Sequence, residues 1–165
     1  MTINIAPGAD YPGNMLDVYT AYLFTFREGF LVNSLAGFLE SLKYRNNDDQ
    51  KKMMQVVDAG KIKGIKRIPE IVFWKGESIE RNSQEYQQLL DEVFKSLFTQ
   101  SAAAKQALID TKDEALSCRY ENDKSKTLLT RDEFITRLLN LREQLNSKQE
   151  SPQQDKRKKK RGRSQ

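Results

Sequence analysis

The stretch from Asn82 to Gln100 constrains the fold most, because its apolar residues repeat with the period of an amphipathic helix. Asn82 followed by Glu85 is typical of a capping box, which predicts that the helix begins at Asn82. An apolar stripe this wide is stable only when it is buried away from water, so we interpret it as the centre of a hydrophobic core rather than as a ligand site. Its members are Tyr86, Leu89, Leu90, Val93, Phe94, Leu97 and Phe98.

Segments rich in aromatic and β-branched residues predict short antiparallel strands. Residues 18–26 and 30–32 flank Arg27-Glu28-Gly29 as the two strands of a hairpin would. Residues 71–74 and 78–79 flank Lys75-Gly76 in the same way, and residues 115–119 predict one more strand. The segment APGADYPGN, with two glycines and two prolines, predicts a loop over residues 6–14.

Good N-capping residues predict the remaining helices. Ser34 precedes apolar residues at helical spacing that continue until Asn46, and Asp48 or Asp49 can cap a short helix that Gly60 would stop. Ser101 opens an alanine-rich helix. Thr130 and Glu133 form a second capping box before a last helix whose buried face is Phe134, Leu138, Leu141 and Leu145.

The basic charge of the chain is concentrated at its C-terminal end. The formal charge is +5, but residues 151–165 hold seven basic residues and one acidic residue, whereas the rest has 21 basic and 22 acidic residues. We therefore expect a neutral domain over residues 1–146 and a basic tail over 147–165 that is disordered when free. The tail cations that could contact nucleic acid are Lys156, Arg157, Lys158, Lys159, Lys160, Arg161 and Arg163.

The segment KIKGIKRIPE, residues 61–70, alternates charged and apolar residues before a proline. We interpret it as an exposed connector or edge strand, with a phosphate-contacting loop as the alternative.

Composition excludes several chemistries. The chain has no histidine and a single cysteine, Cys118, so zinc sites, imidazole catalysis and an internal disulfide framework are not expected. Glycine-rich phosphate-binding motifs and the nucleophile elbow are absent from the sequence, and we expect no cofactor or metal. No apolar run is long enough to span a bilayer and the start lacks signal-peptide blocks, so we expect a soluble, cytoplasmic protein with no membrane partner. Any catalysis would have to use carboxylates.

The order of these segments carries a family resemblance. The hairpin, then SLAGFLESLK at residues 34–43, Trp74, EYQQLLDEVFKSLFTQ, ALIDT and LLTRDEFITRLLNLR resemble a small bacteriophage protein family of unknown function, over about residues 15–145. That family is similar in layout to the NADAR, or YbiA-like, proteins. The resemblance implies a single α+β domain, mainly helical, with small antiparallel strands. It also implies N-glycosidase activity on ADP-ribosyl groups or on phosphoribosyl intermediates of riboflavin synthesis.

The departures from the family pattern concern the site itself. NADAR proteins carry a glutamate and a histidine where this chain has Ala36 and Gly37. Lys43 matches the lysine that ends the motif, Trp74 matches a family tryptophan, and Asp123 corresponds to a family aspartate, although the Trp-Gly pair that follows it is missing. Glu40 lies one helical turn beyond Ala36 and could face the same cleft.

These observations lead to one functional hypothesis and its alternatives. The hypothesis is a phage-type protein with a degenerate N-glycosidase site, which binds a nucleotide-like or ADP-ribosylated ligand, or a host protein, during infection. Glu40 and Asp123 are its candidate catalytic acids, with solvated surface carboxylates as the alternative, and Lys43 and Trp74 are its candidate ligand-binding residues. The other functional classes are a nucleic-acid-associated module anchored by the tail, and a structural subunit.

Overall fold

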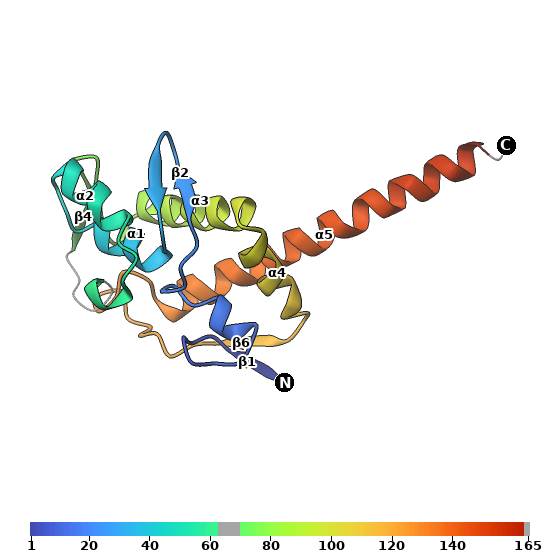
Figure 1. The fold of residues 1–165 in the computed structure, drawn as a ribbon, viewed down its shortest axis with the longest axis horizontal. Helices are drawn as coiled ribbons and strands as arrows, with labels where there is room; N and C mark the ends of the chain where they lie inside the picture. Colours follow the sequence, from blue (N-terminus) through green and yellow to red (C-terminus); the bar gives the residue numbers. More distant parts are fainter. Residues whose placement is uncertain (63–69, 164–165) are drawn as a thin grey trace.

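The structure is a computed structural model that describes the backbone of residues 1–62 and 70–163, and side chains up to Ser147 except that of residue 59. Within these residues, the chain forms helices and three small two-stranded sheets (Figure 1). The predicted class, α+β and mainly helical, is confirmed. The predicted connector over residues 61–70 falls mostly on residues 63–69, which lie outside the described part.

Helix α3, Gln84–Gln100, runs through the core as its apolar stripe predicts. All seven stripe residues are buried. The N-cap, however, is Ser83, whose hydroxyl accepts a hydrogen bond from the Tyr86 N–H at 3.1 Å. The prediction that Asn82 caps this helix was therefore wrong by one residue, because Ser83 offers the acceptor at the position where the first free amides point.

Two antiparallel hairpins lie at one end of the molecule. Strands β2, Phe24–Phe26, and β3, Phe30–Val32, form the first, and β4, Ile71–Trp74, and β5, Glu77–Glu80, form the second. Both predicted turns are confirmed, and each has a non-glycine residue followed by glycine in the left-handed region, Arg27 with Gly29 and Lys75 with Gly76. The first strand is shorter than predicted, because residues 18–23 do not join the ladder.

Helices α1, Leu35–Ser41, and α2, Asn47–Met54, pack against each other beside these hairpins. Ser34 caps α1 as predicted, accepting a hydrogen bond from the Gly37 N–H at 3.0 Å. Helix α2 is capped by Asn46 and not by Asp48 or Asp49. The side-chain oxygen of Asn46, Oδ1, accepts a hydrogen bond from the backbone N–H of each aspartate, so both aspartates belong to the first turn of the helix.

A buried glutamine ties these elements together. The Gln50 amide on α2 is fully buried, and its nitrogen donates to the Ser41 oxygen at 3.1 Å and to the Phe73 oxygen at 2.7 Å. Its oxygen accepts from the Lys75 N–H at 3.1 Å. One side chain therefore satisfies backbone groups at the end of α1, in β4 and at the first residue of the β4–β5 turn.

The other end of the molecule holds α4, Ala102–Asp110, the first part of α5, Arg131–Arg163, and a parallel pair of β1, Thr2–Asn4, with β6, Ala115–Ser117. Strand β6 was predicted. Strand β1 was not predicted; its pairing partner β6 lies more than 100 residues away in the sequence. The α5 backbone is helical to Arg163, and the predicted disorder of the free tail stays a prediction.

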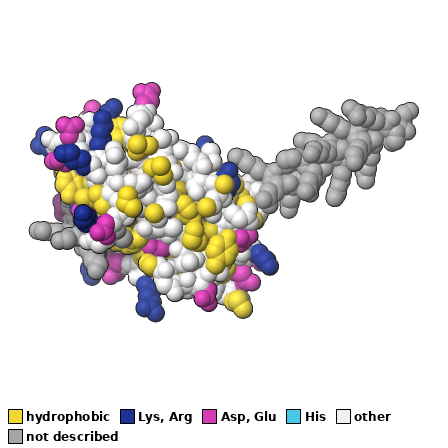
Figure 2. All heavy atoms as spheres, in the orientation of Figure 1, with side chains coloured by type: hydrophobic (Ala, Val, Ile, Leu, Met, Phe, Trp, Pro, Cys, Tyr) yellow, Lys and Arg dark blue, Asp and Glu magenta, His cyan; other side chains and the backbone are white. Residues whose placement is uncertain are grey.

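The surface of the body matches its near-zero charge. In Figure 2 positive and negative side chains are interspersed, with small apolar areas between them.

Candidate functional site

Two of the residues that the resemblance singles out lie on one face of α1, and a third lies just beyond its end. Ala36 and Glu40 follow the i, i+4 spacing that stacks side chains along a helix, and Lys43 lies in the turn that directly follows α1. Ala36 is fully buried, and its N–H donates to the Val18 oxygen at 2.9 Å. The position at which the resemblance implies a carboxylate is therefore a methyl group inside the core.

Glu40 and Lys43 form a largely buried ion pair at the C-terminal end of α1. The Lys43 Nζ lies 3.2 Å from Glu40 Oε2, and the two side chains are 18% and 11% exposed. This approach does not have hydrogen-bonding angles, so among the described residues the buried Oε2 has no hydrogen-bond partner. The Lys43 ammonium compensates the charge of this oxygen, and a ligand that donates a hydrogen bond would add the directional contact that it lacks.

Tyr19 places a phenol close to this pair. Burial, and then the negative charges of Asp17 and Glu40, raise the pKa of Tyr19, so the hydroxyl keeps its proton at neutral pH. The pair therefore has an unsatisfied acceptor, a cation and a neutral hydroxyl within one neighbourhood. Such a set can recognise the hydroxyl and phosphate groups of a nucleotide-like molecule.

Asp17, behind Tyr19, is already fully engaged. Its Oδ1 accepts a hydrogen bond from the Tyr120 hydroxyl at 3.0 Å, and its Oδ2 accepts from the Tyr19 N–H at 2.9 Å. Burial and the Asp17 charge raise the pKa of Tyr120, which keeps this donor protonated. Asp17 therefore positions Tyr19 and the segment that contains Tyr120. Unlike Glu40, it has a hydrogen-bond donor on each carboxylate oxygen.

Asp123, the second candidate acid, lies in an exposed loop. Its Oδ1 accepts from the Ser125 hydroxyl at 2.7 Å and from the Ser125 N–H at 2.9 Å. These two hydrogen bonds lower the pKa of Asp123, so it is ionised at neutral pH and is not poised as a general acid. Its visible role is to close a turn; a role beside Glu40 stays a prediction.

Trp74 belongs to an aromatic cluster on another side of α1. Its ring lies 6.2 Å from that of Phe38, which precedes Glu40 by two residues and so points to nearly the opposite side of the helix. The Arg27 guanidinium covers the Trp74 ring at 5.0 Å. Trp74 is 8% exposed and lines a pocket of about 520 Å³ at the tips of the two hairpins. The structure thus brings Glu40 and Lys43 together and places Trp74 elsewhere.

Sequence reasoning missed the most strongly bonded ionic group in the described part of the chain. Arg81, at the end of β5, is 2% exposed and pairs with Glu133 through Nη1 at 3.0 Å and Nη2 at 2.6 Å. Its Nε and Nη2 also donate to the Thr127 oxygen. The capping box at Thr130 and Glu133 was predicted and is confirmed, with reciprocal hydrogen bonds of 2.8 and 3.0 Å, but nothing local in the sequence pointed to Arg81.

Burial raises the pKa of Glu133, but its hydrogen bonds from Arg81, Gln87 and the Thr130 N–H outweigh burial and lower the pKa overall. Glu133 is therefore a carboxylate whose acceptor capacity is filled by the protein.

The tail cations, residues 156–161 and 163, have side chains outside the described part, so their nucleic-acid contact stays a prediction. Helices in the described residues include none long and apolar enough to cross a membrane. Searching the same residues finds no cluster of histidine, cysteine and acidic side chains arranged to hold a metal ion.

Comparison with known proteins gives two matches. A model of the family described as bacteriophage protein GP30.3 matches residues 10–143. Among solved structures, the NMR structure of the Escherichia coli protein YbiA is similar with a TM-score of 0.60 and 15% sequence identity, over 90% of this chain and 87% of that chain. No curated protein gives a significant match. At this identity, the likeness to YbiA shows the fold and not the activity.

Proposed function

We propose, from the premise that this chain belongs to the bacteriophage protein GP30.3 family and has a YbiA-like fold, that it binds a nucleotide-like or ADP-ribosylated ligand without hydrolysing it efficiently. The binding site in this proposal consists of Glu40 on α1 and Lys43 in the turn that follows it, and we call this site the α1 face. The histidine-free, mainly helical body serves as the scaffold that holds these side chains.

One observation carries the proposal: Ala36 is buried in the core while the Glu40 Oε2, one turn further along, is buried and unsatisfied among the described residues. Removing one transition-state interaction costs enzymes about 2.7 to 4 kcal/mol, or roughly 10²- to 10³-fold in rate. The methyl group of Ala36 therefore supports slow turnover. The unsatisfied oxygen and the Lys43 ammonium support retained binding, with ligand hydroxyls on Glu40 and a phosphate on Lys43.

Calorimetric titration of the full chain with ADP-ribose tests the binding. We expect measurable affinity that falls roughly tenfold in Glu40→Gln and in Lys43→Met, because each change removes one charge-assisted hydrogen bond. Glu28→Gln, a change of the same chemistry at an exposed hairpin turn, is the control and should bind as the parent does. Equal binding by all four proteins would contradict this site.

Mass spectrometry of ADP-ribosylated guanosine incubated with the chain tests the second half. We expect ADP-ribose to be released little faster than without protein. Rapid release that Glu40→Gln abolishes would show that Glu40 has taken over the catalytic role and that the site is active.

A further inference from the structure

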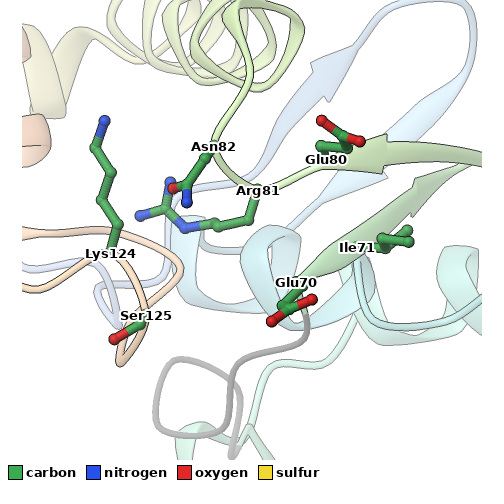
Figure 3. A pocket seen from close by; sticks show the side chains of 7 residues that line it. All are labelled: Glu70, Ile71, Glu80, Arg81, Asn82, Lys124 and Ser125. Carbon is green, nitrogen blue, oxygen red and sulfur yellow. The ribbon is translucent and has the colours of Figure 1, made fainter.

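A pocket of about 440 Å³ lies away from the α1 face, between the ends of β4 and β5 and the loop that precedes α5. Figure 3 shows its lining, with Arg81 and Asn82 near the centre, Lys124 and Ser125 on the loop across from them, and Glu70 and Glu80 at the strand ends. Its volume suits a small polar molecule. The proposed function of the α1 face uses none of these residues.

The buried guanidinium of Arg81 has one donor to spare. Arginine carries five N–H groups, and four hydrogen bonds to Thr127 and Glu133 use four of them. The remaining N–H is on Nη1 and has no acceptor among the residues described. Since Arg81 is 98% enclosed by its partners and rests over the Tyr86 ring at 4.6 Å, it cannot swing away to find one.

Two further donors line the pocket. Lys124 rises from the loop opposite Arg81 in Figure 3, and within the described residues it makes no ion pair. The Asn82 amide lines it too, and it does not cap α3, since Ser83 does. Three donors that line one pocket, one of them rigidly buried, are suited to an anionic group such as a phosphate.

Two carboxylates also line the pocket. Glu70 and Glu80 are exposed groups that accept hydrogen bonds and repel a bare anion. Hydroxyl groups attached to the anion would satisfy these carboxylates. A ligand that carries both a phosphate and hydroxyls therefore fits this lining better than either group alone.

We infer that this pocket binds a phosphorylated polyol, with its phosphate between Arg81 and Lys124 and its hydroxyls on Glu70 and Glu80. The inference does not depend on the Glu40 site, and either can fail without the other.

Titration of the full-length chain with glycerol 3-phosphate, inorganic phosphate and glycerol tests the inference. We expect glycerol 3-phosphate to bind more tightly than phosphate and glycerol to bind least. Lys124→Gln should weaken glycerol 3-phosphate binding roughly tenfold, the value of one charged hydrogen bond. Lys126→Gln, an exposed lysine of the same loop that does not line the pocket, is the matched control and should change it little.

A variant of Glu80 tests the role of the carboxylates that line the pocket. Glu80→Gln should strengthen binding of inorganic phosphate and reduce the advantage of glycerol 3-phosphate over it, whereas Glu77→Gln, on the same strand but outside the pocket, should do neither. Absence of binding by glycerol 3-phosphate, equal loss in Lys124→Gln and Lys126→Gln, or equal affinity for phosphate and glycerol 3-phosphate would overturn the inference.

Discussion

Two sheltered ion pairs among the described residues, Arg81 with Glu133 and Lys43 with Glu40, differ in how completely the protein satisfies them. In the first, Arg81 donates two hydrogen bonds to Glu133 and two to the Thr127 oxygen, and Glu133 also accepts from Gln87 and the Thr130 N–H. The second has a single 3.2 Å approach and leaves Oε2 unsatisfied within the described residues. A filled acceptor contributes to the stability of the fold, and an unfilled one is available to a ligand.

The largest expected effect comes from breaking the filled pair. Glu133→Ala should lower the free energy of unfolding by about 3 to 5 kcal/mol, because it leaves the Arg81 charge buried without its partner. Urea denaturation measures this. The double variant Arg81→Met with Glu133→Leu should recover much of the loss, since no charge then remains buried. If Glu133→Ala unfolds like the parent, the pair does not hold the fold together.

Acid should weaken the same pair. The folded-state pKa of Glu133 is lowered from its ordinary value of 4.5, so its stabilising contribution is present above that value and is lost as the pH falls through the lower, folded-state pKa. We expect the free energy of unfolding of the parent to fall below pH 4.5 more steeply than that of Glu133→Gln. Denaturation curves across this range provide the measurement, and parallel curves would contradict it.

The Glu40–Lys43 pair should matter more for ligand binding than for stability. Glu40→Gln should lower the free energy of unfolding by less than Glu133→Ala does, because Lys43 stays partly exposed to water when its partner is neutral, while it weakens ADP-ribose binding. Thermal unfolding and calorimetry on one preparation measure both. A loss of stability as large as that of Glu133→Ala would mean that Glu40 is structural.

Asp123 allows a narrower comparison. Asp123→Asn keeps the size and the acceptor of an exposed side chain that bonds only within its own turn, so we expect no detectable change in unfolding or in ADP-ribose affinity. Loss of affinity equal to that of Glu40→Gln would place Asp123 in the same site.

The tail should affect neither pair. Changing Lys158, Lys159 and Lys160 to glutamate in the full chain should leave unfolding unchanged and lower the salt concentration that elutes the protein from heparin, because charge alone sets such binding. Unchanged elution would dismiss the tail as an anchor for nucleic acid.

The sequence predicted what depends on neighbours along the chain. The stripe of α3, the turns at Gly29 and Gly76 and the capping box at Thr130 are local patterns, so most elements were found. Small shifts occurred where two polar residues competed, as at Asn82 and Ser83 or Asn46 and Asp48.

Features that depend on contacts distant in sequence were not predictable in this way. Arg81 meets Glu133 across 52 residues, and β1 meets β6 across more than 100. The site was predicted only in part for the same reason. Spacing alone places Glu40 and Lys43 close together, but it could not show that Trp74 packs against Phe38 on another side of α1.

The amide of Gln50 couples α1 to the second hairpin. Its hydrogen bonds join the last turn of α1 to the backbone of Phe73 and Lys75. A shift of α1 along its axis would therefore strain the second hairpin. Occupancy of the Glu40 face should consequently be felt at the far tip of that hairpin, where slower exchange of the Lys75 amide hydrogen would report a bound ligand from a distance.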